Sequence, residues 1–235
     1  MEIQPKRIYF VRRHPDIPAE RFVARWREHG QLAMHFMAQQ GWRNVTRYVH
    51  CDPAHEAADL ASGFPWDGMG IVVFRDAQAR ADHIGFAQAR QALEADEDQA
   101  FAQRVNRCGL VAREDVLRNG PPGALKLARV FQRRPGVSAE QFLGGWADEH
   151  VPRIQASGGN GLLRHVANWP LAPENGKAWG LACAVIEELW FATVQDLRRT
   201  LLAEADALQR QGAPQAADCL FALPVRETVL VGDVA

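Results

Sequence analysis

Two kinds of hydrophobic pattern alternate along the chain. Runs of consecutive apolar residues, such as Met69–Phe74, are typical of strands buried on both faces. Between these runs, apolar residues recur every three or four positions, which indicates amphipathic helices. The pattern predicts strands at Ile8–Arg12, around Arg47, at Met69–Phe74, Cys108–Leu117, Leu127–Gln132, around Arg164, at Ala184–Phe191 and at Leu220–Val231. It predicts helices after the first and fifth of these strands, and at Ala77–Ala95 and Val194–Gln211.

The second half of the sequence repeats the first. Pro15 matches Pro135 and Trp26 matches Trp146, each displaced by 120 positions (135 − 15 and 146 − 26). Further matches with small gaps are Arg47 with Arg164, Phe74 with Trp190, and Arg113-Glu114 with Arg226-Glu227. Matched blocks in one order predict a tandem duplication. The Gly- and Pro-rich segment 119–123 separates the copies and predicts domains at residues 1–118 and 119–235.

Each copy has the element order β-α-β-β-α-β, which is the ferredoxin-like order. A single sheet of this kind leaves one face without helices, yet strands such as Met69–Phe74 are apolar on both faces. The other copy can supply the missing cover. We therefore expect an α+β protein in which two ferredoxin-like halves pack sheet to sheet within one chain.

Composition and charge exclude some partners. Charged residues make up 23% of the 235 residues, and the formal net charge is −1. This balance argues against nucleic acid or an anionic membrane as a partner, and no run of about 18 apolar residues could span a bilayer. The four cysteines lack the spacing of zinc ligands and are typical of reduced thiols. Because Met1–Pro5 does not resemble the start of a signal peptide, we expect a cytoplasmic protein.

Two histidines lie on the apolar stripes of the first helix in each copy. His29 follows Phe22 and Trp26 at helical spacing, and His150 follows Trp146 by four positions. Imidazole is costly to bury without partners, so the pair suggests a general acid or base in a cleft between helix and sheet. The alternative is a core histidine that is hydrogen-bonded to a backbone carbonyl.

Other polar side chains on the predicted strands are candidates for substrate contacts. Arg47 and Arg164 could clamp a carboxylate or enolate, or could pair with a neighbouring acid such as Glu28 or Glu149. Tyr9 could donate to a developing oxyanion or fill the core. The predicted catalytic residues are His29, His150, Tyr9 and Arg47, and the predicted substrate-binding residues are Trp26, Tyr48, Trp66, His83, Arg129, Trp146, Arg164 and His165.

The motifs of both copies resemble the EthD family, and the second copy matches its third-strand signature best. The first copy has the His-Gly of the family at His29-Gly30, where the second has His150-Val151-Pro152. The matching residues are Arg133-Arg134, Pro135, Ala139-Glu140, Phe142, Trp146, His150 and Glu188-Leu189-Trp190-Phe191. The first copy departs from this pattern, because its third strand keeps only Val72-Val73-Phe74 and its spacing from Trp to His is one residue shorter.

The resemblance implies a dimeric α/β-barrel, here closed within one chain. Relatives act in aromatic catabolism and polyketide tailoring, often without metal or organic cofactor, and some distant barrels bind haem. We therefore expect an acid/base enzyme that needs no cofactor and acts on a small apolar, aromatic or lactone-like molecule as an isomerase, cyclase or dehydratase. The alternatives are a monooxygenase, with haem or cofactor-free, and a non-catalytic ligand-binding protein. The first copy is favoured as the active half, and a homodimer of the fused chain stays open.

Overall fold

The computed structural model describes residues 4–41, 43–63, 66–173, 178–211 and 216–232. The first half contains β1 (Lys6–Val11), α1 (Ala19–Gln39), β2 (Val45–Pro53), the 3-10 helix η1 (His55–Leu60), β3 (Gly68–Phe74), α2 (Ala77–Gly85), α3 (Ala87–Ala100), the 3-10 helix η2 (Val105–Arg107) and β4 (Gly109–Arg118). The second half contains β5 (Leu125–Arg133), α4 (Ala139–Gly145), the π-helix η3 (Trp146–His150), α5 (Val151–Gly158), β6 (Leu162–Pro170), β7 (Val185–Phe191), α6 (Val194–Gln211) and β8 (Ala217–Val231).

The eight strands form one closed antiparallel barrel in the order β1-β3-β2-β8-β5-β7-β6-β4. Backbone pairing between β2 and β8 joins the halves on one side, and pairing between β4 and β6 joins them on the other. The prediction of two ferredoxin-like halves packed sheet to sheet as a dimeric α/β-barrel is therefore wrong, although the chain is α+β overall. The two sets of strands meet edge to edge in one ring, instead of stacking face to face.

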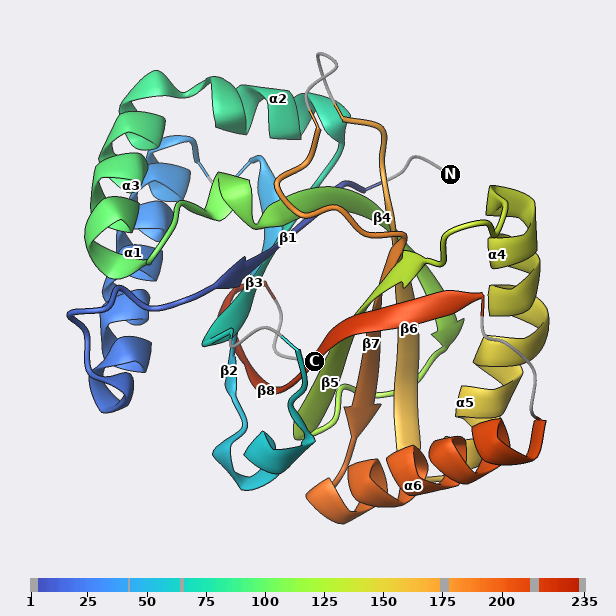
Figure 1. Ribbon diagram of the computed structural model, residues 1–235. Helices are drawn as coiled ribbons and strands as arrows, with labels where there is room; N and C mark the ends of the chain where they lie inside the picture. The colour runs from blue at the N-terminus through green and yellow to red at the C-terminus, as the bar shows by residue number, and fades with distance from the viewer. Residues whose placement is uncertain (1–3, 42, 64–65, 174–177, 212–215, 233–235) are drawn as a thin grey trace.

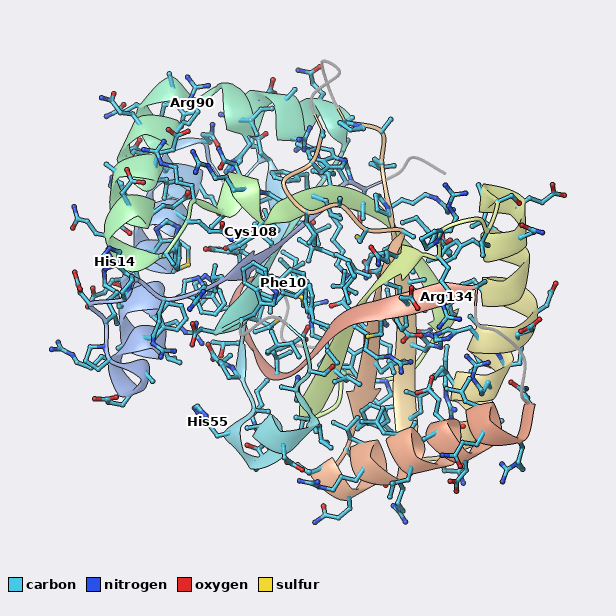
Figure 2. All side chains as sticks on the ribbon, in the orientation of Figure 1. Phe10, His14, His55, Arg90, Cys108 and Arg134 are labelled. Carbon is cyan, nitrogen blue, oxygen red and sulfur yellow. The ribbon has the colours of Figure 1, made fainter. Side chains whose placement is uncertain are left out.

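Barrel closure explains why the strands are apolar on both faces. One face lines the barrel interior, where Ile8, Phe10, Val49 and Leu223 belong to a single buried cluster. The other face is covered by helices: α1, α2 and α3 lie over the strands of the first half, and α4, α5 and α6 over those of the second (Figure 1). Figure 2 shows Phe10 among the strands at the centre of the molecule. An eight-stranded barrel is just wide enough for side chains to fill its interior.

Helix ends follow the local sequence. Ser138 and Gln141 form a capping box at the start of α4, and Pro18 takes the N-cap position of α1. The helix predicted at Val194–Gln211 has those bounds. The helix predicted at Ala77–Ala95 is instead divided into α2 and α3, because the chain leaves helical geometry at Phe86 (φ −73°, ψ 88°) after Gly85. Among the described residues, no helix has the length and apolar character to cross a bilayer.

The first helical segment of the second half contains a π-turn. Residues Trp146–His150 form a π-helix between α4 and α5, whereas α1 is α-helical throughout. A π-turn accommodates one residue more than an α-helical turn. This corresponds to the one-residue difference in spacing between Trp26 and His29 on one side and Trp146 and His150 on the other.

A buried ion network lies on the inner face of the barrel strands. The Lys126 ammonium is 2.7 Å from both Glu188 and Glu227, and Lys6 also pairs with Glu188. Glu188 and the Lys126 side chain have no exposed surface. Burial alone would raise the pKa of Glu188, but the positive charges of Lys126 and Lys6 hold that pKa far below its ordinary value. Removing one member would leave charges buried without a counterion.

We predict that Glu188→Gln lowers the free energy of unfolding by about 3–5 kcal/mol, because two buried lysines lose their shared carboxylate. Urea denaturation followed by circular dichroism measures the change. Glu140→Gln, on the exposed surface of α4, is the control and should stay within about 0.5 kcal/mol of the wild type. A Glu188→Gln protein as stable as the control would show that the network contributes nothing.

Acid should destabilise the fold through the same carboxylate. Because the folded-state pKa of Glu188 is depressed, its contribution is fully present above its unfolded pKa of about 4.3 and is lost as the pH falls towards the folded value. We expect the free energy of unfolding to fall as the pH drops below about 7, because the lowered pKa values of His50 and His83 let the unfolded chain bind more protons, and to fall further below about pH 5, where the unfolded Glu188 takes up a proton. Urea titrations at a series of pH values test this, and stability that rises on acidification would contradict it. The decline should be shallower in Glu188→Gln.

Candidate functional site

The second half gathers three of the predicted site residues around one acid, Glu187 of β7. His150 and His165 each place Nε2 2.8 Å from Glu187 Oε1. Arg129 of β5 lies directly opposite Glu187 in the strand pairing, and its Nε donates to Oε2 over 2.7 Å. The carboxylate is fully buried and receives donors on both oxygens. Sequence reasoning singled out these three partners but missed the acid that joins them.

The charge on Glu187 is maintained by its neighbours. Burial alone would raise the pKa of Glu187, but the Arg129 charge and the hydrogen bonds from His150 and His165 hold it well below its ordinary value. Arg129 also donates to Glu204 of α6 over 2.6 Å. Glu187 is therefore a fixed carboxylate that sets the orientation of both imidazole rings.

A cavity opens beside His150, between the α4–α5 segment and the end of α6. It encloses a volume of about 30 Å³. Its lining includes Phe131, Phe142, Trp146, His150, Arg153 and Gln211. Aromatic side chains beside a few polar groups are typical of sites for small organic molecules, but this volume holds only a few water molecules, so such a ligand would have to displace lining side chains.

The π-turn places His150 at this cavity. Its ring stacks on Trp146 with 4.1 Å between centroids, and Arg153 Nη2 donates to its Nδ1 over 3.2 Å. Because arginine can only donate, His150 Nδ1 accepts and Nε2 carries the proton that is shared with Glu187. His150 therefore presents an unprotonated nitrogen beside the guanidinium.

In the first half, a different histidine takes the position on the tryptophan. The ring of His50 stacks on Trp26 at 4.1 Å. It accepts from Arg27 over 2.7 Å and donates to the Tyr48 hydroxyl over 2.8 Å, and Tyr9 lies 3.4 Å beyond Tyr48. Burial and the Arg27 charge lower the pKa of His50 to about 2. His50 is fully buried.

The two halves differ most where Tyr9 and Arg129 lie. Tyr9 lies opposite Gly70, whose missing side chain leaves room for the tyrosine ring, because a Cβ there would fall 2.1 Å from its Cζ. Arg129 lies opposite Glu187 instead. Burial raises the pKa of Tyr9 to about 12, so it stays a neutral hydroxyl. The first half thus has an uncharged tyrosine pair where the second has an ion pair.

His29 does not face the sheet as predicted. Its Nδ1 lies 2.7 Å from Asp96 of α3, which also pairs with Arg25. His29 and Arg25 outweigh partial burial and lower the pKa of Asp96 to about 2. His83 packs against Phe74 from α2, and burial lowers its pKa to about 4.

The remaining predicted residues belong to the barrel rather than to the cavity. Arg47 pairs with Glu227 at 3.2 Å and Arg164 with Glu114 at 3.3 Å, so each pairs with an acid, but with neither Glu28 nor Glu149. Trp66 packs against Phe10 in the barrel interior. The structure therefore brings together His150, Arg129, His165 and Trp146, separately groups Tyr9, Tyr48 and Trp26, and leaves His29, His83, Arg47, Arg164 and Trp66 apart from both groups.

Three polar residues of these sites had weak signals in the sequence. Glu187 and Glu188 interrupt an otherwise apolar strand, which is the mark of buried acids with partners. Arg153 lies three residues after His150, on the same side of the helical segment. His50 ends an apolar run beside a predicted turn, and nothing in the sequence marks it as buried.

Comparisons with known proteins were made for the sequence and for the fold. No curated protein matches the chain by sequence. One similar structure is a candidate monooxygenase from Fusobacterium nucleatum subsp. nucleatum, with a TM-score of 0.56 and 9% identity over 97% of this chain and 93% of that chain. A second is an anthrone oxidase-like protein, with a TM-score of 0.56 and 12% identity over 100% of this chain and 98% of that chain. A third is chlorite dismutase from Candidatus Nitrospira defluvii in complex with imidazole, with a TM-score of 0.51 and 10% identity over 97% of this chain and 92% of that chain. At such low identity the likeness concerns the fold alone.

The family model of the EthD domain matches residues 14–104. This segment includes α1 and extends past α3. The match does not reach the second half, so a second EthD copy at residues 119–235 stays a prediction. Residues 14–104 of this chain are therefore similar to an EthD domain.

Proposed function

We propose that the chain is an enzyme that removes a proton from a small aromatic molecule in the cavity of the second half and passes the resulting carbanion to O2, as a cofactor-independent monooxygenase. The observation that carries the proposal is His150, which lines an aromatic cavity while its Nε2–H is fixed on the buried Glu187 carboxylate. A base oriented by a buried carboxylate is a recurrent arrangement for proton transfer.

The geometry assigns each residue a step. Arg153 gives up its hydrogen bond to His150 Nδ1 when the substrate binds, and Nδ1 then accepts the acidic proton of the substrate. Glu187 stabilises the imidazolium that forms through its hydrogen bond to Nε2. His165 contacts Oε1 of Glu187 and Arg129 donates to Oε2, so both residues hold the carboxylate in place. Trp146 lies flat against the imidazole, so the ring cannot turn away from Glu187.

The oxidation balances with O2 as the only co-reactant. A methylene flanked by aromatic rings loses a proton to His150, and its carbon bonds one oxygen of O2. The imidazolium protonates the other oxygen to give a hydroperoxide. Loss of the second C–H proton and cleavage of the O–O bond then leave one oxygen on carbon as a ketone and release the other as water. The candidate monooxygenase and the anthrone oxidase-like protein among the structural neighbours support this reaction class.

Haem does not fit the residues around His150. An axial ligand needs a free imidazole nitrogen, but Nε2 lies on Glu187 and Nδ1 faces the Arg153 guanidinium at 3.2 Å. A permanent positive charge beside the coordinating nitrogen opposes binding of an iron cation. Within the described part of the chain, no group of three or more His, Cys, Asp and Glu side chains could hold a metal ion. The proposed steps therefore use side chains alone.

We predict that His150 and His165 are both protonated on Nε2 at neutral pH when uncharged. Both Nε2 atoms face one carboxylate oxygen, which can only accept, and His165 Nδ1 is buried without a partner among the described residues. Long-range nitrogen–proton correlation NMR distinguishes the two tautomers. Finding Nδ1–H on His150 would contradict the proposed base.

We predict that His150→Gln lowers kcat about 10²–10⁴-fold towards anthrone, used as an aromatic carbon-acid probe, because the general base is lost. Oxygen uptake and product absorbance measure turnover. His35→Gln, on the exposed face of α1, is the matched control and should keep wild-type activity.

Three outcomes would contradict this function. Unchanged turnover in His150→Gln together with loss in His29→Gln would move the chemistry to the first half. Proton exchange at the probe without oxygen uptake would place the enzyme among isomerases or lyases. A Soret band in the purified protein would overturn the cofactor-free mechanism.

A further inference from the structure

Resting on the proposed site, we infer that Arg153 is an anion-binding residue and that the natural substrates are aromatic acids, whose carboxylate pairs with its guanidinium. The inference goes beyond the proton transfer, because it concerns recognition by a residue that the reaction itself does not require. It depends on the burial, the incomplete pairing and the position of this one side chain.

Arg153 is buried but poorly paired. Only 9% of its surface is exposed. Its Nη1 reaches Gln211 at 3.5 Å, its Nη2 reaches His150 at 3.2 Å, and its Nε is buried without a partner within the described residues. These distances exceed the roughly 2.7–2.9 Å of charge-assisted hydrogen bonds.

No carboxylate of the described chain lies within 4 Å of this guanidinium, although Glu149 lines the same cavity. Residues 212–215, which follow Gln211 and lie outside the described ranges, read Gly-Ala-Pro-Gln and contain no acid. The counterion is therefore missing from the neighbouring sequence as well.

Two other buried cations of the described residues have acidic partners. Arg129, 6% exposed, pairs with Glu187 and Glu204, and Lys126, 1% exposed, pairs with Glu188 and Glu227. A buried cation without a counterion is unfavourable, because its desolvation is not offset. Arg153 departs from this rule where it meets a cavity, so a bound anion is the natural partner.

The surroundings of Arg153 specify an aromatic anion. Phe131, Phe142 and Trp146 line the same cavity and suit a flat apolar ring. The planar fork of a guanidinium matches the two oxygens of a carboxylate, and the weak contacts to Gln211 and His150 can be exchanged for it. A ring against these walls with its carboxylate on Arg153 would lie next to His150.

The test is the binding of benzoate, with uncharged benzamide as its isosteric comparison. Both are titrated calorimetrically into the wild type, Arg153→Gln, Arg153→Lys and the control Arg90→Gln. Arg90 lies on the exposed surface of α3 in the other half (Figure 2). Circular dichroism melting establishes that each variant is folded.

We expect benzoate to bind the wild type and Arg90→Gln, and benzamide to bind at least about tenfold more weakly. Benzoate affinity should fall at least about tenfold in Arg153→Gln, and less in the lysine variant, which keeps the charge but loses the fork. Equal benzoate affinity in folded Arg153→Gln would overturn the inference, as would absence of binding to the wild type. Inorganic phosphate binding as tightly as benzoate would overturn the aromatic part.

The same titration on His150→Gln separates this inference from the proposed reaction. Benzoate should still bind this variant, because the carboxylate pairs with Arg153 rather than with the imidazole. If anthrone turnover proves absent while benzoate binding depends on Arg153, the proposed function fails and the anion site stands. If turnover depends on His150 but benzoate binding does not depend on Arg153, the anion site fails and the proposed function stands.

Discussion

Everything in this molecule depends on two seams of backbone hydrogen bonds, where β2 meets β8 and β4 meets β6. They turn two four-strand sheets into one ring without free edges. Only a closed ring has an interior in which Lys6, Lys126 and Glu188 can share charges away from water. Closure also fixes the outer faces of the strands, on which the helices and both histidine clusters lie.

The two halves share a tryptophan–histidine stack, but the histidine contacts a tyrosine hydroxyl in one half and a carboxylate in the other. In each, a histidine stacks on the tryptophan of the first helical segment at 4.1 Å. In the first half, His50 comes from a strand and joins a neutral chain that ends in two tyrosines. In the second, His150 comes from the helix and joins the Glu187 carboxylate, which also pairs with Arg129. The charged cluster adjoins the cavity, which is why the proposed chemistry lies there and not in the half that the sequence favoured.

The sequence predicted the elements better than their assembly. Periodicity identified α6 with its final bounds, because its apolar stripe and flanking turns leave no alternative. It could not reveal that α2 and α3 separate at Gly85-Phe86, since glycine is tolerated within helices. The ring closure was missed because runs that are apolar on both faces fit stacked sheets and a barrel equally well. The sequence predicted both histidines of the proposed site and one of its two arginines, because these residue types stand out on apolar helices and strands. It did not predict Glu187, whose role depends on contacts between strands far apart in sequence.

The π-turn at Trp146–His150 distinguishes the helical segment of the proposed site from the regular helix α1 of the first half. The wider π-turn accommodates the one residue by which the spacing of Trp146 and His150 exceeds that of Trp26 and His29. His150 contacts Glu187 on the sheet, whereas His29 contacts Asp96 on the neighbouring helix α3. The two helical segments therefore differ in length between tryptophan and histidine, and not only in which amino acids they contain.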